Sequence, residues 1–139
     1  CAAEALKRWP YIDKSLGTFL SQYGNYPCHL LSTDTPKRTA IFSFPVKFHS
    51  GTCSSDKNNV VAHMRSQFAP GDFVPGWALV ASLQQIEESA LNMVTVADHD
   101  DIKRIVIPRP GCGAGELKWE EVKPELEKLL DNRFSVITF

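Results

Sequence analysis

The stretch IVIPRPGCGAGELKW, residues 105–119, joins a strand-like run to a helix through a loop of small residues. Ile105, Val106 and Ile107 form an unbroken apolar run, which is typical of a strand buried on both faces. Pro108 and Pro110 end that run, because proline donates no backbone hydrogen bond. The stretch therefore predicts a buried strand that leads into a loop and then into a helix.

The loop consists of small residues with three alternating glycines: Gly111, Cys112, Gly113, Ala114 and Gly115. Glycine permits positive φ and a close approach to bare backbone, and N–H groups ahead of a helix can converge on an anion. We call residues 111–115 the glycine loop and predict that it binds phosphate. The alternative is a tight strand-to-helix turn without a ligand.

Two familiar phosphate loops fit this sequence badly. A dinucleotide fingerprint needs its third glycine where this chain has Glu116. A Walker loop needs Gly-Lys-Ser/Thr, whereas Lys118 is followed by Trp119. The loop is therefore assigned to neither class.

A longer segment does match a family. PRPGCGAGELKWEEV, residues 108–122, resembles the segment PRIGCGxGxLxWexV of macrodomains, which are ADP-ribose-binding modules. FSFPVK, residues 42–47, is similar to the strand-end segment FnFPtK of the branch that contains mono-ADP-ribosyl hydrolases and DNA ADP-ribosyl glycohydrolase antitoxins. AAEALKRWPY, residues 2–11, is similar to the first helix of that branch. The resemblance implies a macrodomain-like three-layer α/β/α sandwich with a mixed sheet.

The resemblance also implies that part of the family's domain precedes this sequence. The two opening strands, the aspartate that recognises adenine and the first glycine-rich loop are expected upstream of Cys1, which begins the chain in place of Met. The predicted fold is therefore an N-terminally incomplete α/β sandwich.

The same resemblance implies which residues form the site. The ligand-binding residues are expected at two strand exits, in the glycine loop and at the last strand's end: Phe44, Pro45, Gly111, Cys112, Gly113, Ala114, Gly115 and Phe139. In part of the branch, a lysine that matches Lys47 attacks the anomeric carbon of the distal ribose, assisted by a loop aspartate. Gly115 occupies the aspartate position here, so the adjacent Glu116 is the candidate to assist catalysis.

Several functions remain open at this point. The first is an ADP-ribosyl hydrolase, and the second is a module that binds ADP-ribose or ADP-ribosylated protein or nucleic acid without turnover. An ADP-ribose 1''-phosphate phosphatase is a further alternative. A cysteine-dependent enzyme that uses Cys112 ranks last, because no histidine is placed by the sequence to activate the thiol.

Composition bounds the remaining classes. A chain of 139 residues with 43% hydrophobic content predicts one soluble domain, 1–139, and a net charge of −1 argues against a nucleic-acid partner held mainly by electrostatics. The four cysteines show no CxxC spacing, and the sequence has neither a signal peptide nor a membrane-length apolar run. We therefore expect an intracellular monomer with no metal, cofactor or membrane partner.

The order of elements follows from periodicity and from breaking residues. Helices are expected at 1–8 and 11–23, and strands at 28–32 and 39–44 that form a hairpin about Asp34-Thr35-Pro36. Residues 45–75 predict an ordered flap, and 77–93 a core helix. A solvated turn at 98–101, the strand at 105–107, an amphipathic helix over 122–130 and a strand at 134–139 complete the chain. Ligands bind where strands end in such folds, so residues 44–47 and 108–115 are the expected exits.

Overall fold

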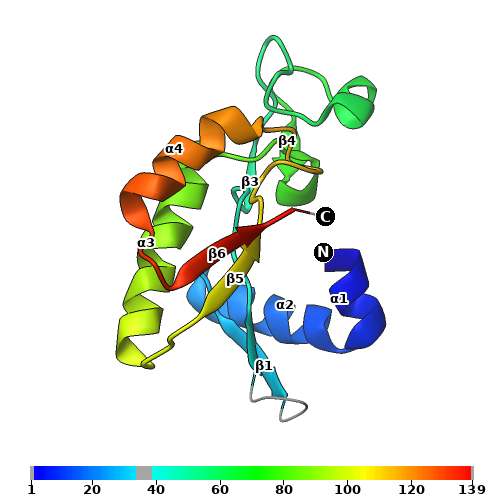
Figure 1. The fold of residues 1–139 in the computed structure, drawn as a ribbon. Helices are drawn as coiled ribbons and strands as arrows, with labels where there is room; N and C mark the ends of the chain where they lie inside the picture. Colours follow the sequence, from blue (N-terminus) through cyan, green and yellow to red (C-terminus); the bar gives the residue numbers. More distant parts are fainter. Residues whose placement is uncertain (1, 34–38, 139) are drawn as a thin grey trace. The chain divides into compact units, whose positions relative to one another are not determined.

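Helices and short strands are mixed along the chain, which is compatible with the predicted α/β class (Figure 1). The computed structural model describes residues 2–33 and 39–138. The contacts divide the chain into two compact units, Cys1–Phe44 and Pro45–Phe139, which are described separately. Within these described residues, the strands form three two-stranded sheets, of which one is parallel and two are antiparallel.

The first unit contains two helices and a hairpin. Trp9 to Tyr11 separates the helices, because Pro10 interrupts the helical hydrogen-bond ladder as predicted. The strands pair in antiparallel fashion, which confirms the predicted hairpin; its turn at Asp34-Thr35-Pro36 lies outside the described residues. The elements are α1 (Ala2–Arg8), α2 (Ile12–Tyr23), β1 (His29–Thr33) and β2 (Thr39–Phe42).

The second unit begins at Pro45, and the sequence correctly predicts an ordered flap over residues 45–75, whose small core extends it to Leu79. Two short strands pair in antiparallel fashion, and two 3-10 helices complete it. A small apolar core holds the flap together: Cys53, Val60, Val74, Ala78 and Leu79, with Met64 and Phe68 packed against them. The elements are β3 (Ser50–Thr52), η1 (Ala62–Gln67), β4 (Phe73–Pro75) and η2 (Gly76–Ala78).

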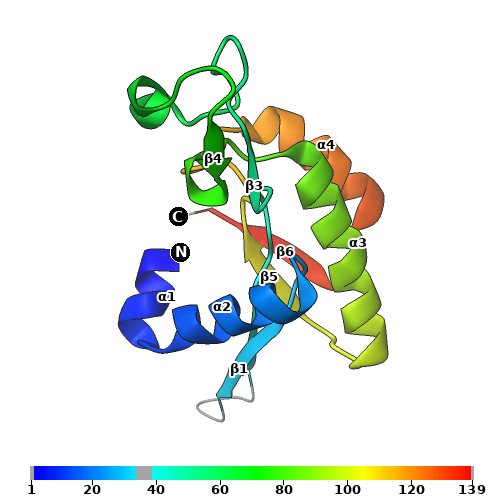
Figure 2. The same cartoon turned by 180° about the vertical axis from the view of Figure 1, so that it is seen from behind.

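The rest of the second unit is a β-α-β unit with one additional helix. β5 (Ile105–Pro108) and β6 (Phe134–Ile137) are parallel, and α4 (Trp119–Leu129) connects them. α3 (Leu83–His99) packs against α4, and Figures 1 and 2 show the two helices together beside the β5–β6 pair. The glycine loop leaves the carboxyl end of β5 and leads to the start of α4, which is the predicted connection.

Predicted details of two elements of the second unit, the strand β5 and the core helix, are wrong. β5 is not buried on both faces: Ile107 is 7% exposed, but Val106, whose side chain points to the opposite face of the strand, is 48% exposed. The strand also continues through Pro108, which pairs with Ile137. The core helix starts at Leu83 instead of Trp77, because the Ser82 hydroxyl accepts the Gln85 N–H and caps it there. It extends to His99, so the polar residues 98–99 form its last turn.

None of the helices in residues 2–33 and 39–138 is long and apolar enough to cross a membrane.

Candidate functional site

The glycine loop folds back on itself at the start of α4. The Leu117 N–H donates to the Gly111 carbonyl at 3.0 Å, and the Glu116 N–H donates to the Gly113 carbonyl at 2.9 Å. The Gly115 carbonyl accepts from the Ala81 N–H at 2.8 Å, which joins the loop to the segment just before α3. Gly113 and Ala114 form the exposed tip, whereas Gly115 is buried at the base.

The three glycines of the loop differ in whether the structure requires a residue without a Cβ. Gly111 has φ +74°, a backbone conformation that residues with a Cβ rarely adopt. A Cβ at Gly115 would lie 2.5 Å from the Gly111 carbonyl oxygen and 2.6 Å from the Ala81 Cβ. A Cβ at Gly113 would meet nothing within 4 Å. Packing therefore requires the glycines at the base of the loop, and it does not require the one at the tip.

The loop presents unused backbone donors. Within the described part of the chain, the N–H groups of Gly113, Ala114 and Gly115 donate to no protein acceptor. Such N–H groups, in a loop with no obstructing side chain ahead of a helix, can bind an anion. The geometry is compatible with the predicted phosphate site.

Lys47 contacts the loop directly. Its Nζ donates to the carbonyl oxygens of Ala114 and Trp77, each at 3.1 Å. Its pKa lies below the ordinary value because partial burial disfavours the charged ammonium, and the Glu116 carboxylate opposes that lowering. The sequence thus correctly predicts that Lys47 lies beside the glycine loop. The ammonium contacts the loop directly and leaves no cleft between Lys47 and the loop.

Glu116 joins the loop to the flap. Its carboxylate accepts the Ala62 N–H at 2.8 Å, at the first residue of η1. Its backbone has φ +64°, which is costly for a residue with a Cβ. The side chain is thus fixed by a structural hydrogen bond, while its charge is close enough to influence Lys47.

Cys112 is a poor candidate nucleophile. Its Sγ donates to the Pro110 carbonyl at 3.4 Å, and burial raises the pKa of the thiol despite the nearby Arg109 guanidinium. A raised pKa keeps the sulfur protonated at neutral pH, where the thiolate is the reactive form. Arg109 itself stacks over the Trp119 ring at 5.1 Å. The structure thus gives no support to a cysteine-dependent enzyme.

The other predicted site residues are less closely associated with the loop. Pro45 is half-buried, and its carbonyl accepts the hydroxyl of the fully buried Ser89 of α3 at 2.7 Å. Phe44 is half-buried and is the last residue of the first unit, and Phe139 lies outside the described residues. The Asp98 carboxylate pairs with Arg133 at 2.7 Å, so this part of the polar turn has a structural partner.

Two hollows lie near the loop without including it. One, of about 430 Å³, runs between α4 and β6 and includes Arg109 and Trp119. The other, of about 320 Å³, lies between the flap and the segment 79–82. Neither is lined by Lys47 or by any residue of the glycine loop. A ligand on the loop would therefore bind at its exposed tip.

The sequence reasoning missed three residues that shape the site. Ala81 packs against the base of the loop, and Ser89 anchors the strand exit that precedes Lys47. Trp77, interpreted as part of a core helix, instead lies in η2 with its side chain 65% exposed. Pro75 and Gly76 before it were a signal that the helix does not begin there.

In the described part of the chain, no group of three or more His, Cys, Asp or Glu side chains is placed to hold a metal ion. Comparison of the chain with protein-family models, with curated proteins and with solved structures found no match.

Proposed function

We propose that this chain is a macrodomain-like module that binds ADP-ribose, free or attached to a target, with the diphosphate on the glycine loop. The observation that carries the proposal is the set of backbone N–H groups at Gly113, Ala114 and Gly115 that have no protein acceptor among the described residues. An open approach over Gly113 accompanies them. A diphosphate supplies several acceptor oxygens and negative charge, which such a loop can accommodate.

The ADP-ribose assignment rests on the resemblance of residues 108–122 to the macrodomain segment. The β5–α4–β6 unit supports it, because the loop follows a strand and precedes a helix, as in the segment's expected context. In this proposal, the β5–β6 pair belongs to the mixed sheet of a three-layer sandwich, with α3 and α4 as one outer layer. The proposed setting is intracellular, where ADP-ribosylated protein or nucleic acid is the expected partner of a monomer.

The contacts of Lys47 favour binding without turnover. The Ala114 carbonyl points at Nζ, and the N–H of Gly115 belongs to the same peptide unit. In a trans peptide these two groups point in opposite directions. Lys47 therefore orients this peptide so that the Gly115 N–H faces away from the amine. A nucleophilic role would require Lys47 to release the Ala114 carbonyl first.

Hydrolysis of the ADP-ribosyl linkage is the second candidate, and one observation favours it. Burial lowers the pKa of Lys47, which increases the fraction of neutral amine that can attack an anomeric carbon. Glu116 opposes this effect, and its hydrogen bond to Ala62 keeps it from moving freely as an acid or base. We therefore expect turnover to be slow where it occurs.

Calorimetry with ADP-ribose and with inorganic pyrophosphate tests the binding proposal on the 139-residue chain. Gly113→Val should abolish binding of both ligands, because the new side chain occupies the approach to the loop. Gly17→Val is the matched control: Gly17 lies in α2, and its Cβ would also meet nothing within 4 Å. Binding of both ligands by Gly113→Val as tightly as by the wild type would refute the phosphate site.

Release assays separate the binding module from the enzymes. Wild type and Lys47→Ala are compared for release of ADP-ribose from modified protein and modified DNA, and for release of phosphate from ADP-ribose 1''-phosphate. Loss of a nucleophile costs several orders of magnitude in rate, whereas loss of one contact costs about ten- to a hundredfold in affinity. Wild-type turnover that disappears in Lys47→Ala would establish hydrolysis, and binding without turnover on every substrate would establish a reader.

A further inference from the structure

Trp77 has an unusual combination of a fixed backbone and a free side chain. It lies in η2, between Gly76 and the fully buried Ala78. The Gly76 N–H donates to the His49 carbonyl at 2.8 Å, and a Cβ at Gly76 would lie 2.4 Å from the Phe48 carbonyl oxygen. The backbone next to Trp77 is therefore tightly packed against the backbone of residues 48–49. Its indole nevertheless remains 65% exposed.

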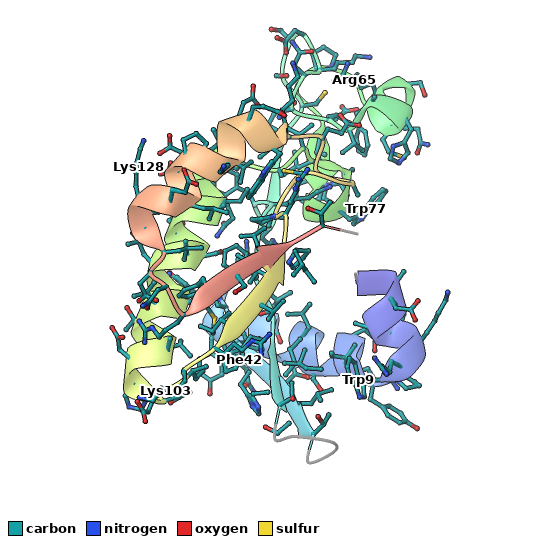
Figure 3. The ribbon with its side chains drawn as sticks, viewed as in Figure 1. Trp9, Phe42, Arg65, Trp77, Lys103 and Lys128 are labelled. Atoms are coloured by element: carbon teal, nitrogen blue, oxygen red, sulfur yellow. The ribbon has the colours of Figure 1, made fainter. Side chains whose placement is uncertain are left out.

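The other two tryptophans of the chain have partners for their rings. The Arg8 guanidinium lies over Trp9 at 5.7 Å, and Arg109 lies over Trp119 at 5.1 Å. Among the described residues, the Trp77 indole has no ring, cation or hydrogen-bond partner. Figure 3 shows this side chain pointing away from its ribbon. Tryptophan is enriched at interfaces, because its large apolar ring offers contact area, and a rigid turn holds this ring in solvent where a ligand can reach it.

Lys47 places the backbone of Trp77 close to the glycine loop. Its Nζ is 3.1 Å from the Trp77 carbonyl and 3.1 Å from the Ala114 carbonyl, so the two oxygens lie within about twice that distance of each other. Ala114 and Gly113 form the exposed tip of the loop. A ligand that binds across the tip with its phosphates is thus within a nucleotide's length of the Trp77 ring.

We propose that Trp77 is a recognition residue that stacks against the planar nucleobase of a nucleotide whose phosphates bind the glycine loop. This inference rests on the proposed function and assigns a second point of contact to the same ligand. The indole offers a wide π face to a base, and stacking of this kind tolerates different bases because each has such a face. In this arrangement the glycine loop binds the phosphates, and the indole binds the nucleobase.

Calorimetry of full-length variants with two probes tests this role. Trp77→Ala should weaken ADP-ribose about ten- to a hundredfold, as expected for removal of a stacking aromatic, and should leave inorganic pyrophosphate unchanged. Trp77→Phe keeps an aromatic face and should recover most of the ADP-ribose affinity. ADP-ribose should also change the tryptophan fluorescence of the wild type more than that of Trp77→Phe.

The outcomes separate this inference from the proposed function. If Trp77→Ala binds ADP-ribose like the wild type while Gly113→Val does not, the stacking role is wrong and the phosphate site stands. If Trp77→Ala loses pyrophosphate as well, Trp77 supports the loop's structure and the stacking role is again wrong. If the wild type binds neither probe, the proposed function fails and the inference fails with it.

Discussion

Substituting alanine for Gly115 should destabilise the chain, whereas the same substitution at Gly113 in the same loop should leave stability almost unchanged. At Gly115 the new Cβ would lie 2.5 Å from the Gly111 carbonyl oxygen, 2.6 Å from the Ala81 Cβ and 3.0 Å from the Gly111 Cα. At Gly113 the same Cβ would meet nothing within 4 Å. Each change adds one methyl group, so the pair compares steric environments within one loop.

The expected cost follows from what the Cβ meets. Two of the three atoms near Gly115 belong to backbone and the third is a Cβ, so no flexible side-chain end can rotate away. Overpacking of this kind costs about 1–3 kcal/mol. Gly113→Ala should stay within about 0.5 kcal/mol of the wild type, as surface substitutions usually do.

Urea unfolding of the full chain, followed by far-ultraviolet circular dichroism, measures both variants. With a slope of about 1–3 kcal/mol/M, the Gly115→Ala midpoint should fall by roughly 1 M, and the Gly113→Ala midpoint should barely change. Equal midpoints for the two variants would refute the packing described for the base of the loop. A larger loss at Gly113 than at Gly115 would refute it equally.

Four further changes test other parts of the structure. Ser89→Ala should lower the free energy of unfolding by about 1–3 kcal/mol, measured in urea, because it leaves the Pro45 carbonyl without its donor; an unchanged midpoint would contradict that hydrogen bond. Asp101→Gly should raise the melting temperature, with a gain of up to about 1 kcal/mol, because Asp101 has φ +52° just after the end of α3; a lower melting temperature would argue against that conformation. Cys112 should react with iodoacetamide at pH 7.5 more slowly than glutathione does, as followed by peptide mass spectrometry, because burial raises the pKa of its thiol; faster reaction would contradict this. The pKa of Lys47 is lowered in the folded state, so the unfolded chain binds more protons than the folded chain between that lowered pKa and 10.5. The contribution of Lys47 to the free energy of unfolding therefore rises with pH over this range. Lys47→Met should lose this rise in urea unfolding measured at several pH values, and the same pH profile in wild type and variant would refute the lowered pKa.

Local signals allowed much of the fold to be predicted from the sequence. Pro10 separates α1 from α2, and the β-branched and aromatic residues of 39–44 indicated the second strand of the β1–β2 hairpin. The apolar residues of 45–75 correctly indicated an ordered flap, because a segment of that length with Val60 and Met64 can bury a small core. These features depend on neighbouring residues, which a sequence displays directly.

The errors concern features that depend on distant partners. Leu79 and Leu83 have helical spacing, yet the Val80 N–H bonds to the Asn59 carbonyl and holds this segment in an extended conformation. Val106 looks like a core residue, but its exposure depends on whether another element packs over its face of β5. Periodicity cannot report either contact.

The candidate site was predicted in its residues more than in its geometry. The sequence predicted that Lys47 and the glycine loop lie at neighbouring strand exits, and the structure places them in contact. It did not reveal that the contact is a hydrogen bond to a carbonyl, nor that Glu116 binds the flap, because hydrogen-bond partners 54 to 67 residues apart leave no local pattern. The ligand-binding roles, the number of domains and the contribution of Phe139 stay predictions.

The glycine loop takes its shape only in the folded chain, because residues from other segments anchor it. The loop is held by Lys47, by Ala81 and, through Glu116, by Ala62, which come from three separate parts of the chain. Its shape therefore cannot form until those segments have assembled, and an unfolded chain offers a ligand no equivalent surface. A ligand at one hundred times its dissociation constant would then raise the free energy of unfolding by about 2.7 kcal/mol. Because the anchors arrange the N–H groups in advance, little conformational entropy would remain to be lost if a ligand bound to them.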